Sequence, residues 1–270
     1  MKTLTLSVAL GFVASFGYCA DLNLRDLVAQ SISNYDKDWN AALDFTYTEH
    51  EVTKDAAGRP KTTEISQVSV LNGTPYSRVI GKNGHPLTGE EARKENEKYQ
   101  KTLSLRENET PEQRARRIRK YEEERRFLHE IPNAFDMKLL GHETLAGRSN
   151  YVIALTPKPG YVPQSKNARM FSDINGKLWM DEHDLRWTQA EANVINTISI
   201  GWVLARIGPG AHITMKQVKV DGEHWMPKEI DVNGSARIML LKSRTLDQTI
   251  SFADYKRVRA PSPTAAAKNR

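Results

Sequence analysis

Histidine and acidic side chains are the residues of this chain that could bind a metal ion or transfer a proton. The seven histidines are His50, His85, His129, His142, His183, His212 and His224. No two of them stand at the spacing of a metal-binding motif such as HExxH. The densest polar cluster, Asp181 to Asp184 with the sequence DEHD, lies between two strand-like runs. Loops collect polar residues because they are solvated, so we expect a loop there and no metal site or cofactor.

Nucleophilic catalysis leaves no linear signature in this sequence either. There is no GxSxG elbow and no phosphate-binding P-loop. A catalytic triad is assembled in space rather than in sequence, so a hydrolase of undefined type is kept as a third hypothesis. We assign no catalytic residue and expect a protein that is not an enzyme.

The N-terminus has the pattern of a secretory signal peptide. Lys2 precedes an uncharged apolar run from Leu4 to Phe16, small residues follow, and the first acid is Asp21. Such a run is too short to span a bilayer, which needs about 20 apolar residues. We predict a signal peptide over residues 1–20 and a periplasmic location. The alternative is a lipid anchor on Cys19, the only cysteine of the chain, because residues 16–19 resemble a lipoprotein cleavage box.

Composition indicates one soluble domain after export. About 240 residues, 21–259, can bury a single hydrophobic core, and the Pro- and Ala-rich residues 260–270 are predicted to form a disordered tail. The net charge of +6 is a mild excess. No basic stripe with interleaved aromatic residues occurs, so we expect no nucleic-acid partner.

Alternating apolar and polar residues from Leu43 onward predict strands, and turn signals separate them. Five dipeptides favour two-residue hairpin turns: Asn72-Gly73, Asn83-Gly84, Asn175-Gly176, Asp221-Gly222 and Asn233-Gly234. Asn, Asp and Gly tolerate the positive φ angles of such turns. The sequence therefore predicts a mainly β (α+β) fold built on an antiparallel meander.

Two regions depart from the strand pattern. Residues 22–34 show helical periodicity. Residues 88–130 form a charged insertion, in which capping-box sequences at Thr88 and Thr110 predict helices over 90–105 and 111–129. The second helix carries Arg116, Arg117 and Arg119, which we interpret either as a solvated face or as a docking surface for a partner.

Apolar residues occupy both faces of some predicted strands. Trp179, for example, lies between Leu178 and Met180. One reading is that the helices cover the second face; the other is that sheet and helices enclose an apolar cavity. The candidate cavity residues, chosen from the alternation, are Phe45, Tyr47, Trp179, Trp187 and Trp202.

Three stretches resemble a known family. Residues 141–153 (GHETLAGRSNYVI), 176–181 (GKLWMD) and 225–229 (WMPKE) are similar to motifs of the periplasmic lipoprotein-sorting superfamily, which includes LolA, LolB and the RseB/MucB stress sensors. The resemblance covers about residues 40–257. It implies an open half-barrel of antiparallel strands wrapped around helices, with an apolar cavity for lipid. It transfers no ligand-binding residue to a position of this chain.

These observations lead to a first hypothesis of a non-catalytic periplasmic protein that holds lipid or the acyl chains of lipoproteins. The alternative is an envelope stress sensor or protein-interaction module, whose partner would be an envelope membrane protein.

Overall fold

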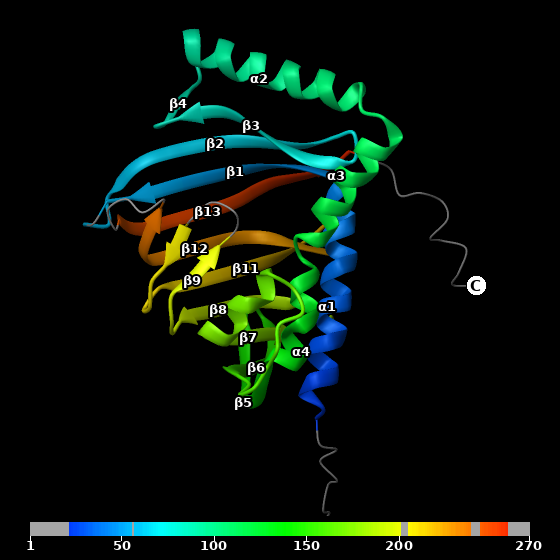
Figure 1. Cartoon of the computed structure of the whole chain (residues 1–270), viewed down its shortest axis with the longest axis vertical. Helices are drawn as coiled ribbons and strands as arrows, with labels where there is room; N and C mark the ends of the chain where they lie inside the picture. The colour runs from blue at the N-terminus through cyan, green and yellow to red at the C-terminus, as the bar shows by residue number, and fades with distance from the viewer. Residues whose placement is uncertain (1–21, 56, 201–204, 239–243, 259–270) are drawn as a thin grey trace, which may run out of the picture.

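The structure is a computed structural model that describes residues 22–55, 57–200, 205–238 and 244–258 (Figure 1). The predicted signal peptide, Cys19, Trp202 and the C-terminal tail lie outside these residues. Among the described helices, none is long and apolar enough to cross a membrane.

One antiparallel sheet of 13 strands forms the body of the protein. Its strands are β1 (Phe45–Lys54), β2 (Pro60–Leu71), β3 (Thr74–Lys82), β4 (His85–Pro86), β5 (Phe135–Leu145), β6 (Arg148–Pro157), β7 (Ile174–Asp181), β8 (Trp187–Val194), β9 (Ile198–Ile200), β10 (Ala205–Ile207), β11 (His212–Val220), β12 (His224–Ile238) and β13 (Arg244–Arg257). The order is β4-β3-β2-β1-β13-β12-β11-β8-β7-β6-β5, with β10 paired to β12 and β9. Because β4 and β5 do not pair with each other, the sheet is open. The predicted half-barrel class is confirmed.

Three of the five predicted turn dipeptides do form turns. Asn72-Gly73, Asn83-Gly84 and Asp221-Gly222 each have two positive φ angles, as a type I′ turn requires. A fourth such turn, Ala146-Gly147, joins β5 to β6.

The other two dipeptides lie inside strands, so their prediction as turns was wrong. Gly176 belongs to β7, and a Cβ atom there would lie 2.2 Å from the Glu191 carbonyl oxygen. In β12, a Cβ atom on Gly234 would lie 2.3 Å from Cβ of Ala211. At both positions the missing side chain allows two backbone segments to approach closely, which is one reason for a glycine inside a strand.

Helix α1 (Leu24–Ala41) covers one face of the sheet and runs across the strands (Figure 1). The Asn23 side chain caps its N-terminus by accepting from the Asp26 N–H. The helix continues beyond Asn34, where the prediction ended it. The reason is tertiary: Asn34 is buried and donates to the carbonyl of Leu185 at 3.3 Å, so a residue that disfavours helices is held in place.

The hydrophobic core lies between α1 and the β6–β8 part of the sheet. Val28 and Ile32 of α1 pack there with Ile153, Leu178 and Met180. Short helices close its side: η2 (Arg126–Glu130), α4 (Ile131–Ala134) and η3 (Asn167–Asp173). This packing fixes the position of α1 over the sheet.

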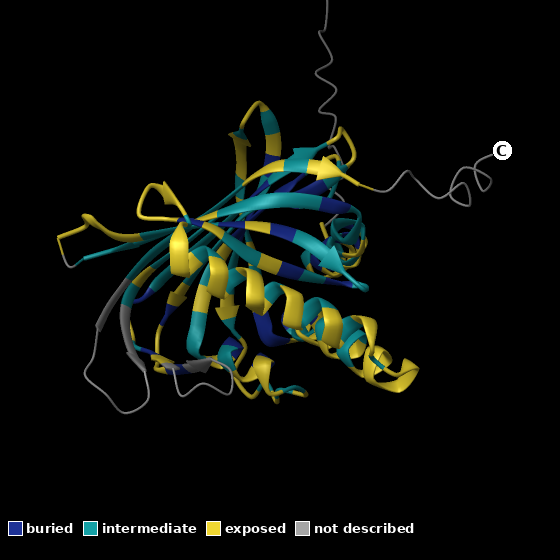
Figure 2. Ribbon diagram, turned by 90° about the horizontal axis from the view of Figure 1, so that it is seen from above, coloured by how far each residue is buried: buried dark blue, intermediate teal, exposed yellow. Residues whose placement is uncertain are grey.

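The charged insertion forms α2 (Gly89–Glu107) and α3 (Pro111–Glu123). The predicted capping box of α3 is present, with reciprocal hydrogen bonds between Thr110 and Gln113. Neither helix contains a buried residue, and the surface of α2 is largely exposed (Figure 2). The second helix ends at Glu123, earlier than predicted.

Helix α2 lies along β3, near one end of the sheet (Figure 1). The Glu95 carboxylate accepts a hydrogen bond from the backbone N–H of Val79, a residue of β3, at 3.2 Å. At the other end, β5 contains an irregularity in its pairing between Leu139 and Gly141. Both ends of the sheet therefore depart from a regular exposed strand.

Candidate functional site

Two cavities lie on the face of the sheet that α1 covers. Cavity I, of about 190 Å³, opens to solvent and is bordered by α1, α3 and the β1, β2, β12 and β13 strands. Cavity II, of about 160 Å³, is also open and is bordered by η2, α4, η3 and the β7, β8 and β11 strands. Both volumes remain free although the side chains around them are packed, and both are largely apolar, so they are candidate ligand sites.

Aromatic side chains dominate cavity I. They are Tyr35, Trp39, Phe45, Tyr47, Tyr121, Trp225 and Tyr255, joined by Val68, Val70 and Met226. The rings of Trp39 and Tyr121 stack with centroids 5.1 Å apart, and those of Tyr47 and Tyr255 are also 5.1 Å apart. Such pairs fix the shape of the wall and offer apolar surface to a ligand.

Cavity II is lined largely by aliphatic and phenyl side chains. They include Leu128, Ile131, Phe135, Leu155, Phe171, Ile174, Leu178, Ala190, Ile213 and Met215. Gly176 lies in its floor, where the backbones of β7 and β8 approach. This wall suits a saturated chain better than a polar group.

A stacked pair of rings connects the walls of the two cavities. Tyr35 lines cavity I and Trp187 lines cavity II, and their centroids are 5.4 Å apart. The Trp187 indole N–H donates to Ser31 Oγ of α1 at 2.8 Å, which orients the ring. Each cavity wall therefore contributes one ring to this aromatic stack.

Ionisation inside cavity I is suppressed by burial. Burial raises the pKa of Tyr35 to about 12 and also raises the pKa values of Tyr47, Tyr121 and Tyr255. Burial likewise raises the pKa of the Asp38 carboxyl, against the hydrogen bond from Arg186 that lowers it. The tyrosine hydroxyls consequently stay neutral at physiological pH.

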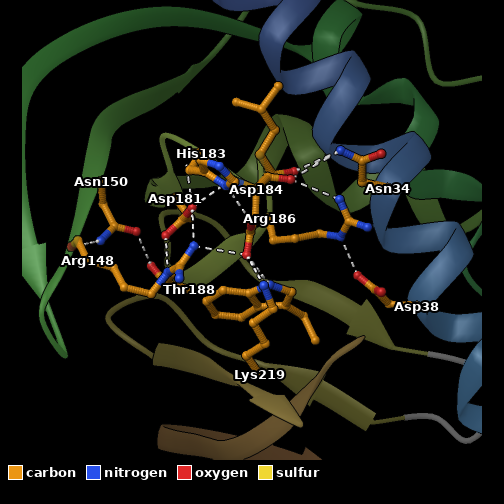
Figure 3. A network of polar contacts seen from close by, with 12 residues as sticks. Asn34, Asp38, Arg148, Asn150, Asp181, His183, Asp184, Arg186, Thr188 and Lys219 are labelled. Atoms are coloured by element: carbon orange, nitrogen blue, oxygen red, sulfur yellow. Dashed lines mark hydrogen bonds and ion pairs between the residues drawn. The ribbon is translucent and has the colours of Figure 1, made fainter. Parts of the chain in front are cut away.

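A polar network anchors α1 above these cavities (Figure 3). Asp38 accepts from Arg186 Nε, and Asn34 donates to the loop that precedes β8. In that loop, Asp184 accepts from Lys219 Nζ at 2.8 Å and from the Trp225 indole N–H at 3.1 Å. The network thus ties α1 to the β7–β8 loop and to β11 and β12.

The cluster at Asp181–Asp184 belongs to this network and forms the predicted loop. Asp181 accepts from Arg148 Nη2 at 2.9 Å. Burial opposes ionisation of both Asp181 and Asp184, but hydrogen bonds from Arg148 to the first and from Lys219 to the second outweigh it and lower both pKa values. Across the described ranges there is no group of three His, Cys, Asp or Glu side chains that could hold a metal ion.

The predicted cavity residues separate into three groups. Phe45 and Tyr47 line cavity I, and Trp187 lines cavity II. Trp179 points to the opposite face of the sheet from its neighbour Leu178, and its indole N–H donates to Glu143 at 2.7 Å. Trp202 lies outside the described residues. Lipid binding by these side chains stays a prediction.

The predicted docking arginines also differ from one another. Arg116 and Arg119 are exposed. Arg117 is turned towards the β2–β3 turn, where it pairs with Glu109 at 2.5 Å and donates to the Asn72 carbonyl at 3.0 Å. Its contacts hold α3 to the sheet, and the docking role stays a prediction for all three arginines.

Helical residues of the site were missing from the predicted set. Tyr35 and Trp39 stand four positions apart on α1, and Tyr121 lies on α3. The signal for the first two was their i, i+4 spacing, which places both rings on one helix face once the helix is extended beyond Asn34.

The chain matches no family model and no curated protein sequence. Among solved structures it is similar to a domain assigned as an outer membrane lipoprotein-sorting protein from Vibrio parahaemolyticus, with 12% identity, a TM-score of 0.37 and coverage of 90% of this chain and 98% of that chain. It is also similar to a LolA superfamily protein from Nitrosomonas europaea, with 13% identity, a TM-score of 0.29 and coverage of 89% and 97%.

A third similar structure is the MucA/MucB complex of Pseudomonas aeruginosa, with 10% identity, a TM-score of 0.22 and coverage of 86% of this chain and 99% of that chain. These solved structures include members of the superfamily that the motifs in residues 141–229 resemble.

Proposed function

We propose that this protein is a non-catalytic binding protein of the periplasm that holds lipid or the acyl chains of lipoproteins. The observation that carries the proposal is the pair of apolar cavities on the face of the sheet that α1 covers, whose walls are connected by the Tyr35–Trp187 stack. The signal-peptide pattern of residues 1–20 supports the location.

Apolar transfer is the driving force in this proposal. Each methylene that leaves water for such a cavity contributes about 0.8 kcal/mol. An apolar cavity of about 150 Å³ accepts a group the size of benzene. Cavities I and II, at about 190 and 160 Å³, therefore each accept a short section of chain. A longer chain occupies both when the Tyr35 and Trp187 rings part.

Native mass spectrometry of the mature protein, purified from the periplasm of an expressing bacterium, tests the proposal. We expect a bound lipid or acylated peptide in stoichiometric amount, identified after organic extraction. A mass without added ligand, unchanged after incubation with envelope lipids, would contradict it.

Cavity-filling variants give the test its control. Ala42→Phe fills cavity I and Ala190→Phe fills cavity II, since both alanines line those cavities. Ala115→Phe places the same ring on the exposed surface of α3. We expect the first two variants to lose bound lipid and the third to keep it, with circular dichroism showing that all three are folded. Equal lipid content in all three would exclude the cavities as the binding site.

The surface of α3 supports a second candidate, a protein-interaction module. Within the part of the chain that the structure describes, Arg116 and Arg119 are exposed and make no ion pair. Reversing both charges leaves Arg117 and its clamp intact. An interaction module should then lose an envelope partner in affinity purification while its lipid content is unchanged.

A further inference from the structure

The carboxamide of Gln217 is a buried polar group in the wall of cavity I. Gln217 belongs to β11 and is only 8% exposed. Among the residues that the structure describes, no hydrogen bond reaches this side chain, and its amide atoms, unlike Trp39 Nε1, are not sealed from solvent. They therefore face the open volume of the cavity. Buried amides are normally paired, so this one indicates a polar group on the ligand.

A β-bulge places Gln217 beside Tyr255. The pairing of β11 with β12 shifts register between Lys216 and Gln217, which sets Gln217 opposite Pro227. Pro227 lines the same cavity, and its carbonyl accepts a hydrogen bond from the Tyr255 hydroxyl at 2.6 Å. The amide and the Tyr255 ring therefore belong to one side of cavity I.

A negative charge lies close to the aromatic pair on this side. The rings of Tyr47 and Tyr255 have centroids 5.1 Å apart. Burial raises the pKa values of both hydroxyls, and the Glu49 carboxylate on β1 raises them further, so its charge is near both rings. Within the described ranges, no cation contributes to either pKa shift. This side of the cavity is therefore aromatic and negative.

Glu49 is a half-buried carboxylate without a cation of its own. Ser77 Oγ donates to it at 3.2 Å. In the part of the chain that the structure describes, the one charged group that shifts its pKa is Glu51, which has the same sign. Burial raises the pKa of Glu49 most, because the charged form is poorly solvated there. A positively charged ligand group would compensate this charge.

The positive charges near the wall of cavity I are already compensated. Three arginines each face a carboxylate: Arg125 pairs with Asp36, Arg186 with Asp38, and Arg257 with Asp221. Glu49 differs from these carboxylates because no guanidinium neutralises it. The local charge therefore favours a cation over an anion in this cavity.

We propose that cavity I binds a small organic amine in its ammonium form, with Glu49 as the counter-ion. The ammonium group contacts the Tyr47–Tyr255 pair by cation–π interaction, and one of its N–H groups donates to the Gln217 carbonyl. The body of the ligand is apolar and packs on the remaining wall, since a cavity of about 190 Å³ accepts one ring with a short arm. This inference goes beyond the proposed lipid binding, for which cavity II remains available.

The test compares three probes of similar size: 2-phenylethylammonium, 2-phenylethanol and phenylacetate. Isothermal titration calorimetry measures their binding to the full mature protein. Glu49→Gln removes the charge and keeps the shape, and Gln217→Leu removes the amide. Glu229→Gln is the matched control, because it changes the net charge equally, lines neither cavity and already pairs with Lys216 at 2.7 Å.

We expect wild-type protein to bind the ammonium probe more tightly than the alcohol, and the carboxylate most weakly. Glu49→Gln should weaken ammonium binding about tenfold and leave alcohol binding unchanged. Gln217→Leu should weaken ammonium binding about fivefold, and Glu229→Gln less than about twofold. Unchanged ammonium affinity in Glu49→Gln or Gln217→Leu, or equal losses in Glu49→Gln and Glu229→Gln, would overturn the inference.

Thermal unfolding supplies a second readout, which also shows that each variant is folded. The ammonium probe should raise the Tm of wild-type protein and of Glu229→Gln, and raise that of Glu49→Gln much less. An equal rise in all three would show that Glu49 is not the counter-ion and would overturn the inference. No lipid enters these measurements, so their failure leaves the proposed lipid binding standing, and failure of lipid binding leaves the amine site standing.

Discussion

Helices α1 and α3 lie against the same sheet, and they hold to it by different contacts. α1 buries Val28 and Ile32 completely or nearly so in the core. α3 has no buried residue and is attached by Arg117, by the stack of Tyr121 on Trp39, and by Ile118, whose Cδ1 atom lies 3.5 Å from the site of a Cβ on Gly73. One helix is therefore part of the folded core, while the other is fastened to its surface. Cavity I lies between them.

The largest difference is expected from a matched pair of isoleucines. Ile32→Ala removes a side chain that is 1% exposed and should lower the free energy of unfolding by about 2–5 kcal/mol. Ile118→Ala on α3 should cost less than about 1 kcal/mol, because its side chain is only half buried. Urea denaturation measures both, and similar losses would mean that α3 is as much a part of the core as α1.

The polar anchor of α1 predicts a pH dependence. The pKa of Asp184 is lowered in the folded protein, and its ordinary value is about 3.9. Its contribution is therefore complete above about pH 5 and is lost as the pH falls towards the folded-state pKa. Asp184→Asn should cost about 1.5–3 kcal/mol at neutral pH, and the gap to wild type should close in acid.

The pKa of Glu49, a residue of β1, is shifted in the opposite direction to that of Asp184. Burial raises its pKa, so the folded protein binds the proton more tightly and gains stability as the pH falls. Glu49→Gln should be at least as stable as wild type at neutral pH. Denaturant unfolding across the acid range checks both variants, and a loss of stability in Glu49→Gln at neutral pH would reverse the expected sign.

A third prediction concerns the floor of cavity II. Gly176→Ala places a methyl group against the Glu191 carbonyl and should cost about 1–3 kcal/mol through displacement of β7 from β8. The exposed neighbour provides the control, since Lys177→Ala should change the unfolding free energy by less than about 0.5 kcal/mol. A neutral Gly176→Ala would show that the strands can separate there without loss.

The smallest global effect should come from the clamp of α3. Arg117→Met removes the ion pair with Glu109 and the hydrogen bond to the Asn72 carbonyl. Because α3 contributes little to the core, we expect faster amide hydrogen exchange in α2 and α3 with exchange in α1 unchanged. Arg117→Lys should restore little, since an ammonium cannot reproduce the forked contacts of a guanidinium. Unchanged exchange in α3 would show that other contacts hold the helix.

Local sequence signals predicted much of the fold. The capping box at Thr110 and the turns at Asn72-Gly73 and Asn83-Gly84 depend on neighbouring residues alone, and the structure has them. Gly176 and Gly234 were wrongly predicted as turns. Each is a glycine because another backbone segment packs closely against it, and that segment is too distant in the sequence to be seen from the neighbouring residues.

The site was predicted in part for the same reason. Phe45 and Tyr47 are found from strand alternation, but the helix residues that face them come from elsewhere in the chain. Trp187 and its partner Ser31, for example, are 156 positions apart. Trp179 shows the limit of alternation, because a strand with apolar residues on both faces does not reveal which face meets α1.

The structure of the two edge strands bears on how readily the protein aggregates in concentrated solution. An open sheet offers unpaired backbone groups at both ends, which can recruit further chains and start aggregation. Near one end, Glu95 of α2 accepts a hydrogen bond from the Val79 N–H, and the edge strand β4 has only two residues. At the other end, an irregularity interrupts the pairing of the edge strand β5. The fold can therefore contain two apolar cavities while its edge strands offer few regular backbone groups for pairing with another chain.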